Sequence, residues 1–127
     1  MFVVIITRME AFFPDLDVNR LLPEDVRFIE LTPEPLPDGR RIRTHLSLTP
    51  FRTPPLIELI LTDPQGETCG GASIVEPTGW NLDLTLHIRT LEIKHGQYSL
   101  NAVLSYPELG DVDQRTVKMD IPVENQI

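Results

Sequence analysis

The sequence contains a single cysteine, Cys69, so no disulfide can form within the chain. Cys69 belongs to no Cys-x-x-Cys pair and to no cysteine and histidine spacing that is typical of a metal site. No basic residue stands near it in the sequence to lower the pKa of its thiol. We therefore expect Cys69 to be a small buried hydrophobic residue in a strand rather than a nucleophile.

Long apolar runs and an excess of positive charge are also lacking. The apolar stretch Phe2–Ile6 is too short to cross a bilayer and lacks the basic start and cleavage pattern of a signal peptide. There are 11 Lys and Arg residues against 19 Asp and Glu residues, which gives a net charge of −8. These features predict a cytoplasmic protein that binds neither membranes nor nucleic acids.

The motifs of common enzymes are absent as well. The sequence has no Gly-x-Ser-x-Gly elbow, and Gly70–Gly71 fits a strand bulge better than a phosphate-binding loop. Asp15–Asn19 alternates oxygen-bearing side chains as a calcium loop does, but Arg20 and Val26 replace the glycine and carboxylate that such a loop requires. We therefore predict a chain that is not an enzyme and has no catalytic residues, cofactor or metal.

Prolines are abundant, with 12 in the chain, and they favour many short strands over long helices. Between the prolines and turn sequences such as Asp63–Gly66, apolar and polar residues alternate with the period of two that is typical of half-buried strands. The strands predicted from this pattern are Phe2–Thr7, Val26–Leu31, Arg41–Leu48, Leu56–Thr62, Thr68–Val75, Leu82–Ile88, Gly96–Tyr106 and Val117–Val123.

We expect one domain over residues 1–127, in which residues 1–39 supply an N-terminal strand and a cover segment and residues 40–123 form the sandwich core. Within the second predicted strand, the alternation places Val26 and Phe28 on one face and Ile29 and Leu31 on the other. Residues 10–25 hold several large apolar side chains, which predict either a short helix or an irregular segment that covers a sheet edge.

The stretch Gly96–Tyr106 carries the clearest architectural signal, because a glycine turn leads into a strand with Tyr98 on its apolar face. Leu91, Gly96 and Tyr98 resemble the leucine, glycine and tyrosine that precede the sixth strand of immunoglobulin-like and fibronectin-type domains. The resemblance implies an all-β, immunoglobulin-like antiparallel β-sandwich of about seven to eight strands, with an N-terminal strand and a short irregular or helical segment. It also implies that the Tyr98 hydroxyl bonds to the backbone near residues 91–94.

Two features depart from antibody-type domains. No cysteine pair joins the sheets, and the one tryptophan, Trp80, lies outside the third strand. The hairpin Ile57–Ile74 and the strand sequence Leu-Thr-Leu-His-Ile are similar to those of small uncharacterised bacterial sandwich proteins of unknown function. This resemblance supplies no catalytic residues, because sandwich folds host many activities.

Several basic side chains point to the polar face of the predicted strands. If the strands around residues 41–48 and 82–88 are neighbours, these side chains form a patch that suits a carboxylate or phosphate group of a partner. The alternative, which is common on exposed strands, is that the cations pair with nearby Asp and Glu. A zinc site would instead require His45, His87 and His95 to converge. The predicted patch consists of Arg41, Arg43, His45, His87 and Arg89.

Trp80 follows the break at Pro77–Gly79, where an exposed ring would stack on a sugar or anchor a protein partner. Packing over the end of the core is the alternative for this side chain. We predict a non-catalytic interaction module that binds a protein partner or a second copy of itself through a sheet face or edge. The alternative function is a small-ligand or carbohydrate-binding module built on Trp80 and adjacent loops.

Overall fold

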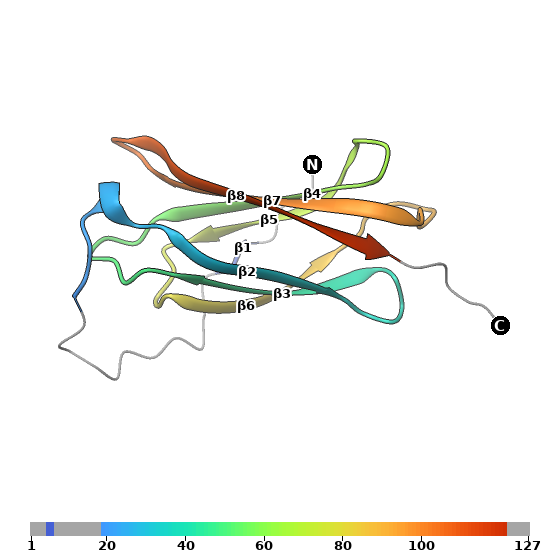
Figure 1. Cartoon of the computed structure of the whole chain (residues 1–127), viewed down its shortest axis with the longest axis horizontal. Helices are drawn as coiled ribbons and strands as arrows, with labels where there is room; N and C mark the ends of the chain where they lie inside the picture. Colours follow the sequence, from blue (N-terminus) through green and yellow to red (C-terminus); the bar gives the residue numbers. More distant parts are fainter. Residues whose placement is uncertain (1–4, 7–18, 122–127) are drawn as a thin grey trace.

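Strands in the structure begin and end near the proline, glycine and aspartate residues that interrupt the apolar alternation. The computed structural model describes residues 5–6 and 19–121, which form eight strands and one 3-10 helix, Pro23–Asp25 (Figure 1). The strands are β1 (Ile5–Ile6), β2 (Phe28–Pro35), β3 (Arg41–Leu48), β4 (Leu56–Thr62), β5 (Thr68–Val75), β6 (Asn81–His87), β7 (Gly96–Tyr106) and β8 (Gly110–Ile121). No helix in this part of the chain is long and apolar enough to cross a membrane.

The strands form two stacked sheets (Figure 1). The larger sheet has the order β1-β5-β4-β7-β8, and the smaller sheet has the order β2-β3-β6. Neighbouring strands run antiparallel, except that β1 pairs parallel with β5. Counted from β2, the first, second and fifth strands share the smaller sheet, as strands A, B and E do in immunoglobulin sandwiches. The structure confirms the predicted all-β antiparallel sandwich.

The core lies between the two sheets, because each sheet turns its apolar positions toward the other. On β6, for example, Leu82, Leu84 and Leu86 are at most 6% exposed, whereas Asn81 and Asp83 face solvent. β3, β4 and β7 show a similar alternation. Burial of apolar surface, at about 25 cal/mol per Å², is the main favourable contribution to the stability of such a core.

The prediction of a strand at Val26–Leu31 is wrong in its bounds. β2 begins at Phe28 and continues through Pro33 to Pro35. Proline has no backbone N–H and is therefore expected to end a central strand. Among the described residues, however, β2 lies at the edge of its sheet and has a partner on one side only.

The predicted placement of Phe28 and Leu31 on opposite faces is also wrong, because β2 contains a β-bulge. The bulge lies between Phe28 and Glu30, which are opposite consecutive residues of β3, so Ile29 is an extra residue. One extra residue reverses the alternation that follows. Leu31 is consequently buried with Phe28, and Ile29 is 58% exposed.

The last strand is longer than predicted, since β8 begins at Gly110 rather than at Val117. The register with β7 places residues 113, 115 and 117 opposite the inward residues of that strand. Two of these inward positions hold Asp113 and Arg115, so the apolar alternation that reveals the other strands is absent here. The first half of β8 was therefore not predicted, because charged residues occupy its inward positions.

Asp113 and Arg115 bind the bulge of β2 across the space between the sheets. Asp113 Oδ2 accepts the N–H of Phe28 at 2.8 Å. The Arg115 guanidinium donates to the carbonyls of Ile29, at 2.9 Å, and Phe28, at 3.1 Å. These bonds pair backbone groups at the bulge and join the edge strands β2 and β8. Inward-pointing charges on an edge strand also protect it from pairing with other chains.

Several predictions fall partly or wholly outside the described residues. Of the predicted strand Phe2–Thr7, the structure describes Ile5–Ile6, which form β1. Of residues 10–25, it describes residues 19–25, in which Pro23–Asp25 form the 3-10 helix. Val123 and most of the calcium-like sequence Asp15–Asn19 lie outside the described ranges.

The predicted tyrosine corner is present where the chain enters β7. Tyr98 is 1% exposed, and its hydroxyl donates to the carbonyl of Lys94 at 2.7 Å. Gly96 has a φ of 132°, which residues with a side chain rarely adopt. A Cβ at Gly96 would also lie 3.2 Å from Cγ of Pro64 in the β4–β5 turn. Both features explain why glycine precedes the tyrosine.

Leu91, the third residue of the resemblance, is 98% exposed, and Ile93 packs against the core instead. The Arg40 guanidinium donates to the carbonyls of Thr90, at 2.9 Å, and Leu91, at 3.1 Å. These bonds attach the loop between β6 and β7 to the start of β3.

Replacement of Tyr98 by Phe would leave the Lys94 carbonyl without its buried donor. We expect the Tyr98→Phe variant to lose about 1–2 kcal/mol of unfolding free energy, measured by urea unfolding. The control is Ser99→Ala, because Ser99 is the next residue of β7 and lies on its outer side. A Tyr98→Phe variant as stable as this control would contradict the corner assignment.

Candidate functional site

The outer face of the three-stranded sheet gathers most of the basic side chains predicted to form a patch. β3 and β6 are antiparallel neighbours, as the patch requires. The side chains that point away from the core lie on the odd-numbered residues of both strands. The register pairs, across the two strands, Arg41 with His87, Arg43 with Thr85 and His45 with Asp83.

Local carboxylates neutralise part of this face. Arg41 Nε lies 2.7 Å from Asp38 Oδ2. His45 lies between two acids, with Nδ1 2.9 Å from Asp83 Oδ1 and Nε2 3.6 Å from Glu30 Oε1. The face therefore carries charges of both signs, which is the ion-pair alternative of the sequence analysis.

The register separates the histidines that a zinc site would need. His45 is four residues along β3 from Arg41, the residue opposite His87, which is a distance of about 13 Å at 3.3 Å per residue. Arg89 lies beyond the end of β6, and its N–H donates to the Cys69 carbonyl of β5 at 2.8 Å. Among residues 5–6 and 19–121, no three His, Cys, Asp or Glu side chains gather closely enough to hold a metal ion.

A shallow hollow of about 350 Å³ lies at β6 on this face, lined by Arg43, Asp83, Leu84 and Thr85. The Leu84 side chain points into the core and is 6% exposed, so Leu84 contributes mainly backbone to the lining. The hollow thus combines charged side chains of opposite sign with the backbone of a strand.

Trp80 is partly buried against the core, which agrees with the packing alternative for this residue. Its ring meets Phe51 edge to face, with the ring centroids 5.8 Å apart and the planes at 88°. The guanidinium carbon of Arg20 lies 5.8 Å from the Trp80 ring centroid. The ring is therefore packed among neighbours rather than presented as an open stacking platform.

Arg20 and Phe51, which contact Trp80, also line a second hollow of about 340 Å³. Glu76 in its wall has a φ of 53°, a left-handed conformation that is costly for a residue other than glycine. This hollow combines apolar surface with arginine side chains. Its lining consists of Arg20, Phe51, Arg52, Pro54, Glu76, Pro77 and Thr78.

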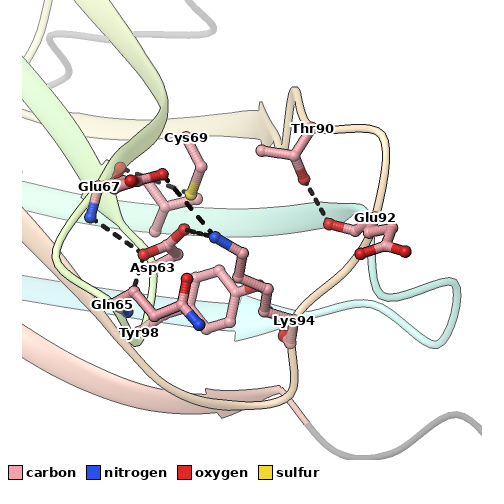
Figure 2. Close-up of polar contacts among 9 residues, drawn as sticks. Asp63, Gln65, Glu67, Cys69, Thr90, Glu92, Lys94 and Tyr98 are labelled. Atoms are coloured by element: carbon pink, nitrogen blue, oxygen red, sulfur yellow. Dashed lines mark hydrogen bonds and ion pairs between the residues drawn. The ribbon is translucent and has the colours of Figure 1, made fainter.

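Asp63 forms a buried polar centre, of which only the turn was predicted from the sequence. The turn is present, since the Gly66 N–H donates to the Asp63 carbonyl at 3.0 Å. The carboxylate makes further bonds: Oδ1 accepts the N–H groups of Gln65, at 2.8 Å, and Glu67, at 3.0 Å, and Oδ2 accepts Lys94 Nζ at 3.0 Å (Figure 2). The Asp63 side chain is 2% exposed and ties the β4–β5 turn to the loop before β7.

These contacts decide the protonation of the ion pair. Burial acts to raise the pKa of Asp63, but bonds from the Glu67 N–H, the Lys94 side chain and the Gln65 N–H outweigh it and hold this pKa below 3.8. The hydrogen bond to Asp63 raises the pKa of Lys94 above its ordinary value. An aspartate at the start of a turn predicts the bonds to the backbone N–H groups. Nothing in the sequence predicts the ion pair with Lys94, which is 31 residues away.

Cys69 lies close to this polar centre (Figure 2) and is 0% exposed. Its Sγ donates to the Leu61 carbonyl at 3.6 Å. Burial, followed by the negative charge of Asp63, raises the pKa of the thiol to about 11, and the opposing effect of Lys94 is smaller. The expectation that Cys69 is a small buried residue in a strand is confirmed. A nucleophilic cysteine requires the opposite shift.

The sequence matches no known protein family, and no curated protein matches it. Solved structures do share its fold. A glycosyl hydrolase family 2 member from Bacteroides cellulosilyticus superposes with a TM-score of 0.55 at 12% identity, over 76% of this chain and 15% of that chain. A β-glucuronidase from Bifidobacterium dentium, in complex with coumarin-3-O-glucuronide, superposes with a TM-score of 0.55 at 14% identity, over 76% of this chain and 17% of that chain.

A β-glucuronidase from Ruminococcus gnavus superposes with a TM-score of 0.50 at 12% identity, again over 76% of this chain and 16% of that chain. At these identities the likeness shows a common β-sandwich fold. The chain spans about a sixth of the length of each of these glycosidases.

Replacement of Asp63 by Asn would remove the charge that pairs with Lys94 while keeping one oxygen acceptor. Because the pKa of Asp63 is lower in the folded than in the unfolded chain, its contribution to stability is present above about pH 4 and is lost as the pH falls further. We expect wild type to be the more stable protein near neutral pH and to lose this advantage over Asp63→Asn below about pH 4. Urea unfolding of both proteins at a series of pH values measures the difference, and parallel pH profiles would contradict it.

Proposed function

We propose that this chain is a non-catalytic protein-binding module that accepts an extended segment of a partner along the outer edge of β6. The observation that carries this proposal is that the β6 backbone bonds to β3 on one side and leaves its other side open to a partner strand. The Leu48 N–H donates to the Trp80 carbonyl, and the Ile88 N–H donates to the Arg40 carbonyl, each at 2.8 Å. In an antiparallel ladder such bonded pairs recur at every second residue, so the even-numbered residues of β6 bond to β3.

The odd-numbered residues of β6 consequently direct their N–H and C=O groups away from β3. Within residues 5–6 and 19–121, no strand pairs with this side of β6. The hollow lined by Asp83, Leu84 and Thr85 lies beside these backbone groups. Strand addition at such an edge gains affinity from main-chain bonds and specificity from alternate side chains.

The other long edge strands are less suited to a partner. β2 has a bulge at Ile29 and prolines at positions 33 and 35. β8 has a register shift and turns Asp113 and Arg115 toward β2. Both are devices that discourage pairing at an edge. β6 is regular, with seven residues, no proline and no register shift, which supports it as the binding edge.

The non-catalytic part of the proposal rests on other observations. The raised pKa of Cys69 favours the thiol over the nucleophilic thiolate. The histidines of the outer face stand opposite Asp83 and Arg41 on separate rows of the sheet.

A small-ligand or carbohydrate-binding module is the second candidate. It is favoured by the 340 Å³ hollow, in which Arg20 and Arg52 lie beside apolar walls. Arginine suits a carboxylate, and aromatic and proline surfaces suit the apolar face of a sugar. The β-glucuronidase whose structure contains a glucuronide provides a chemical precedent for an acidic sugar on a protein with a similar sandwich, at 14% identity.

The protein-binding proposal predicts that Thr85→Pro, which removes an outward N–H from β6, abolishes strand addition. The matched control is Thr85→Ala, which keeps that N–H. The probe is a blocked seven-residue peptide of alternating threonine and valine, titrated into labelled protein and followed by amide NMR shifts. We expect shifts centred on Asn81–Thr85 in wild type and Thr85→Ala but none there in Thr85→Pro. Shifts confined to β2 or β8 would refute the proposal.

The ligand-binding candidate predicts a change in the fluorescence of Trp80, which is the single tryptophan of the chain. A titration with glucuronate should alter the emission of wild type, since the hollow shares Arg20 and Phe51 with the surroundings of Trp80. Arg52→Ala should weaken the response, and glucose serves as the uncharged control. Emission that stays constant with both sugars removes this candidate.

A further inference from the structure

We infer that the partner segment carries a basic side chain opposite Asp83, with an apolar residue on each side of it. This inference rests on the proposed function and specifies its partner. It follows from the length of the open edge, from the charges beside it and from the side chains that point inward from β6.

The open part of the β6 edge is short and centred on Asp83. At its far end, a Cβ on Gly70 of β5 would lie 2.5 Å from the carbonyl oxygen of His87, so the β5 backbone lies directly against that carbonyl. The Arg89 N–H is bonded to β5 as well. As far as residues 5–6 and 19–121 show, the outward groups left for a partner belong to Asn81, Asp83 and Thr85.

The charges beside this open part of the β6 edge favour a cation at its centre. The Asp83 side chain is 73% exposed, and Glu30, on the other side of His45, is 48% exposed. A partner residue directly opposite Asp83 would have its Cβ about 5 Å from that of Asp83, close enough for a cross-strand ion pair. Arg43 lies beside Thr85, so the partner residue opposite Thr85 should be neutral or acidic.

A second copy of the chain is poorly suited to pair with the same open edge of β6. Antiparallel two-fold pairing that uses all three outward residues would place Asp83 opposite Asp83 of the other copy, with Asn81 opposite Thr85. Like charges directly opposite each other destabilise a strand pair. The charge at the centre of the edge therefore favours a different chain as partner.

The flanking apolar residues follow from the pleat. Asp83 points outward between Leu82 and Leu84, whose side chains are buried at the edge of the core. In a paired strand, the residues beside the basic one would point to the same inward side and cover this edge. The recognised pattern is therefore apolar, basic, apolar in an extended segment.

The test compares two blocked seven-residue peptides that are identical except for the central residue, Gly-Thr-Val-Lys-Val-Thr-Gly and Gly-Thr-Val-Glu-Val-Thr-Gly. Binding to the full chain is measured by NMR titration at low salt. We expect wild type to bind the lysine peptide about fivefold more tightly than the glutamate peptide. Asp83→Lys should reverse this preference, and Asp83→Asn should remove it. Circular dichroism checks that both variants fold.

The outcomes separate the inference from the proposed function. Equal binding of the two peptides, lost in Thr85→Pro, would keep the β6 edge as the binding site and overturn the basic partner. Failure of both peptides, together with failure of the threonine and valine peptide, would overturn the proposed function itself. Sedimentation that shows a wild-type dimer, which Thr85→Pro dissociates, would assign the edge to a second copy and overturn the inference.

Discussion

Unpaired backbone at the sheet edges is the constraint on which most of this structure depends. A sandwich whose sheets do not close leaves N–H and C=O groups exposed along its outer strands. β2 and β8 protect each other's edges. Asp113 and Arg115 occupy inward positions of β8 that are apolar in the other strands, and their side chains bind the backbone of the β2 bulge. β6 retains a regular edge. The proposed function and its partner both follow from this difference between edges.

The loop between β6 and β7 explains why the edge is open over a short length. The Tyr98 hydroxyl, the Lys94–Asp63 ion pair and the Arg40 bonds attach this loop to three separate parts of the sandwich. They hold the chain as it leaves β6 toward β5, where the His87 carbonyl meets Gly70. The contacts at this end of β6 therefore limit the open edge to the part of the strand before His87.

Strands with one buried face were predictable wherever that face is uniformly apolar. The bounds of β3, β4, β5 and β7 match the sequence prediction, and the Tyr98 bond was predicted from the resemblance. β2 and β8 were mispredicted for physical reasons: an extra residue at Ile29 reversed the alternation, and charged residues replaced apolar ones at inward positions. The basic patch was predicted as a set of residues, with pairing to nearby acids as the alternative, but the structure alone shows that Asp83 and Glu30 are the two acids beside His45.

The sequence by itself determined the class of fold, the buried face of most strands and the corner at Gly96 and Tyr98, because these depend on residues close together in the chain. The tertiary structure alone decided which strands became edges, which carboxylate met each cation and which backbone groups remained open. Those features depend on residues far apart in sequence: Asp63 meets Lys94 across 31 residues, and Asp113 meets Phe28 across 85. Local alternation carries no information about such pairs, since many pairings satisfy the same period of two.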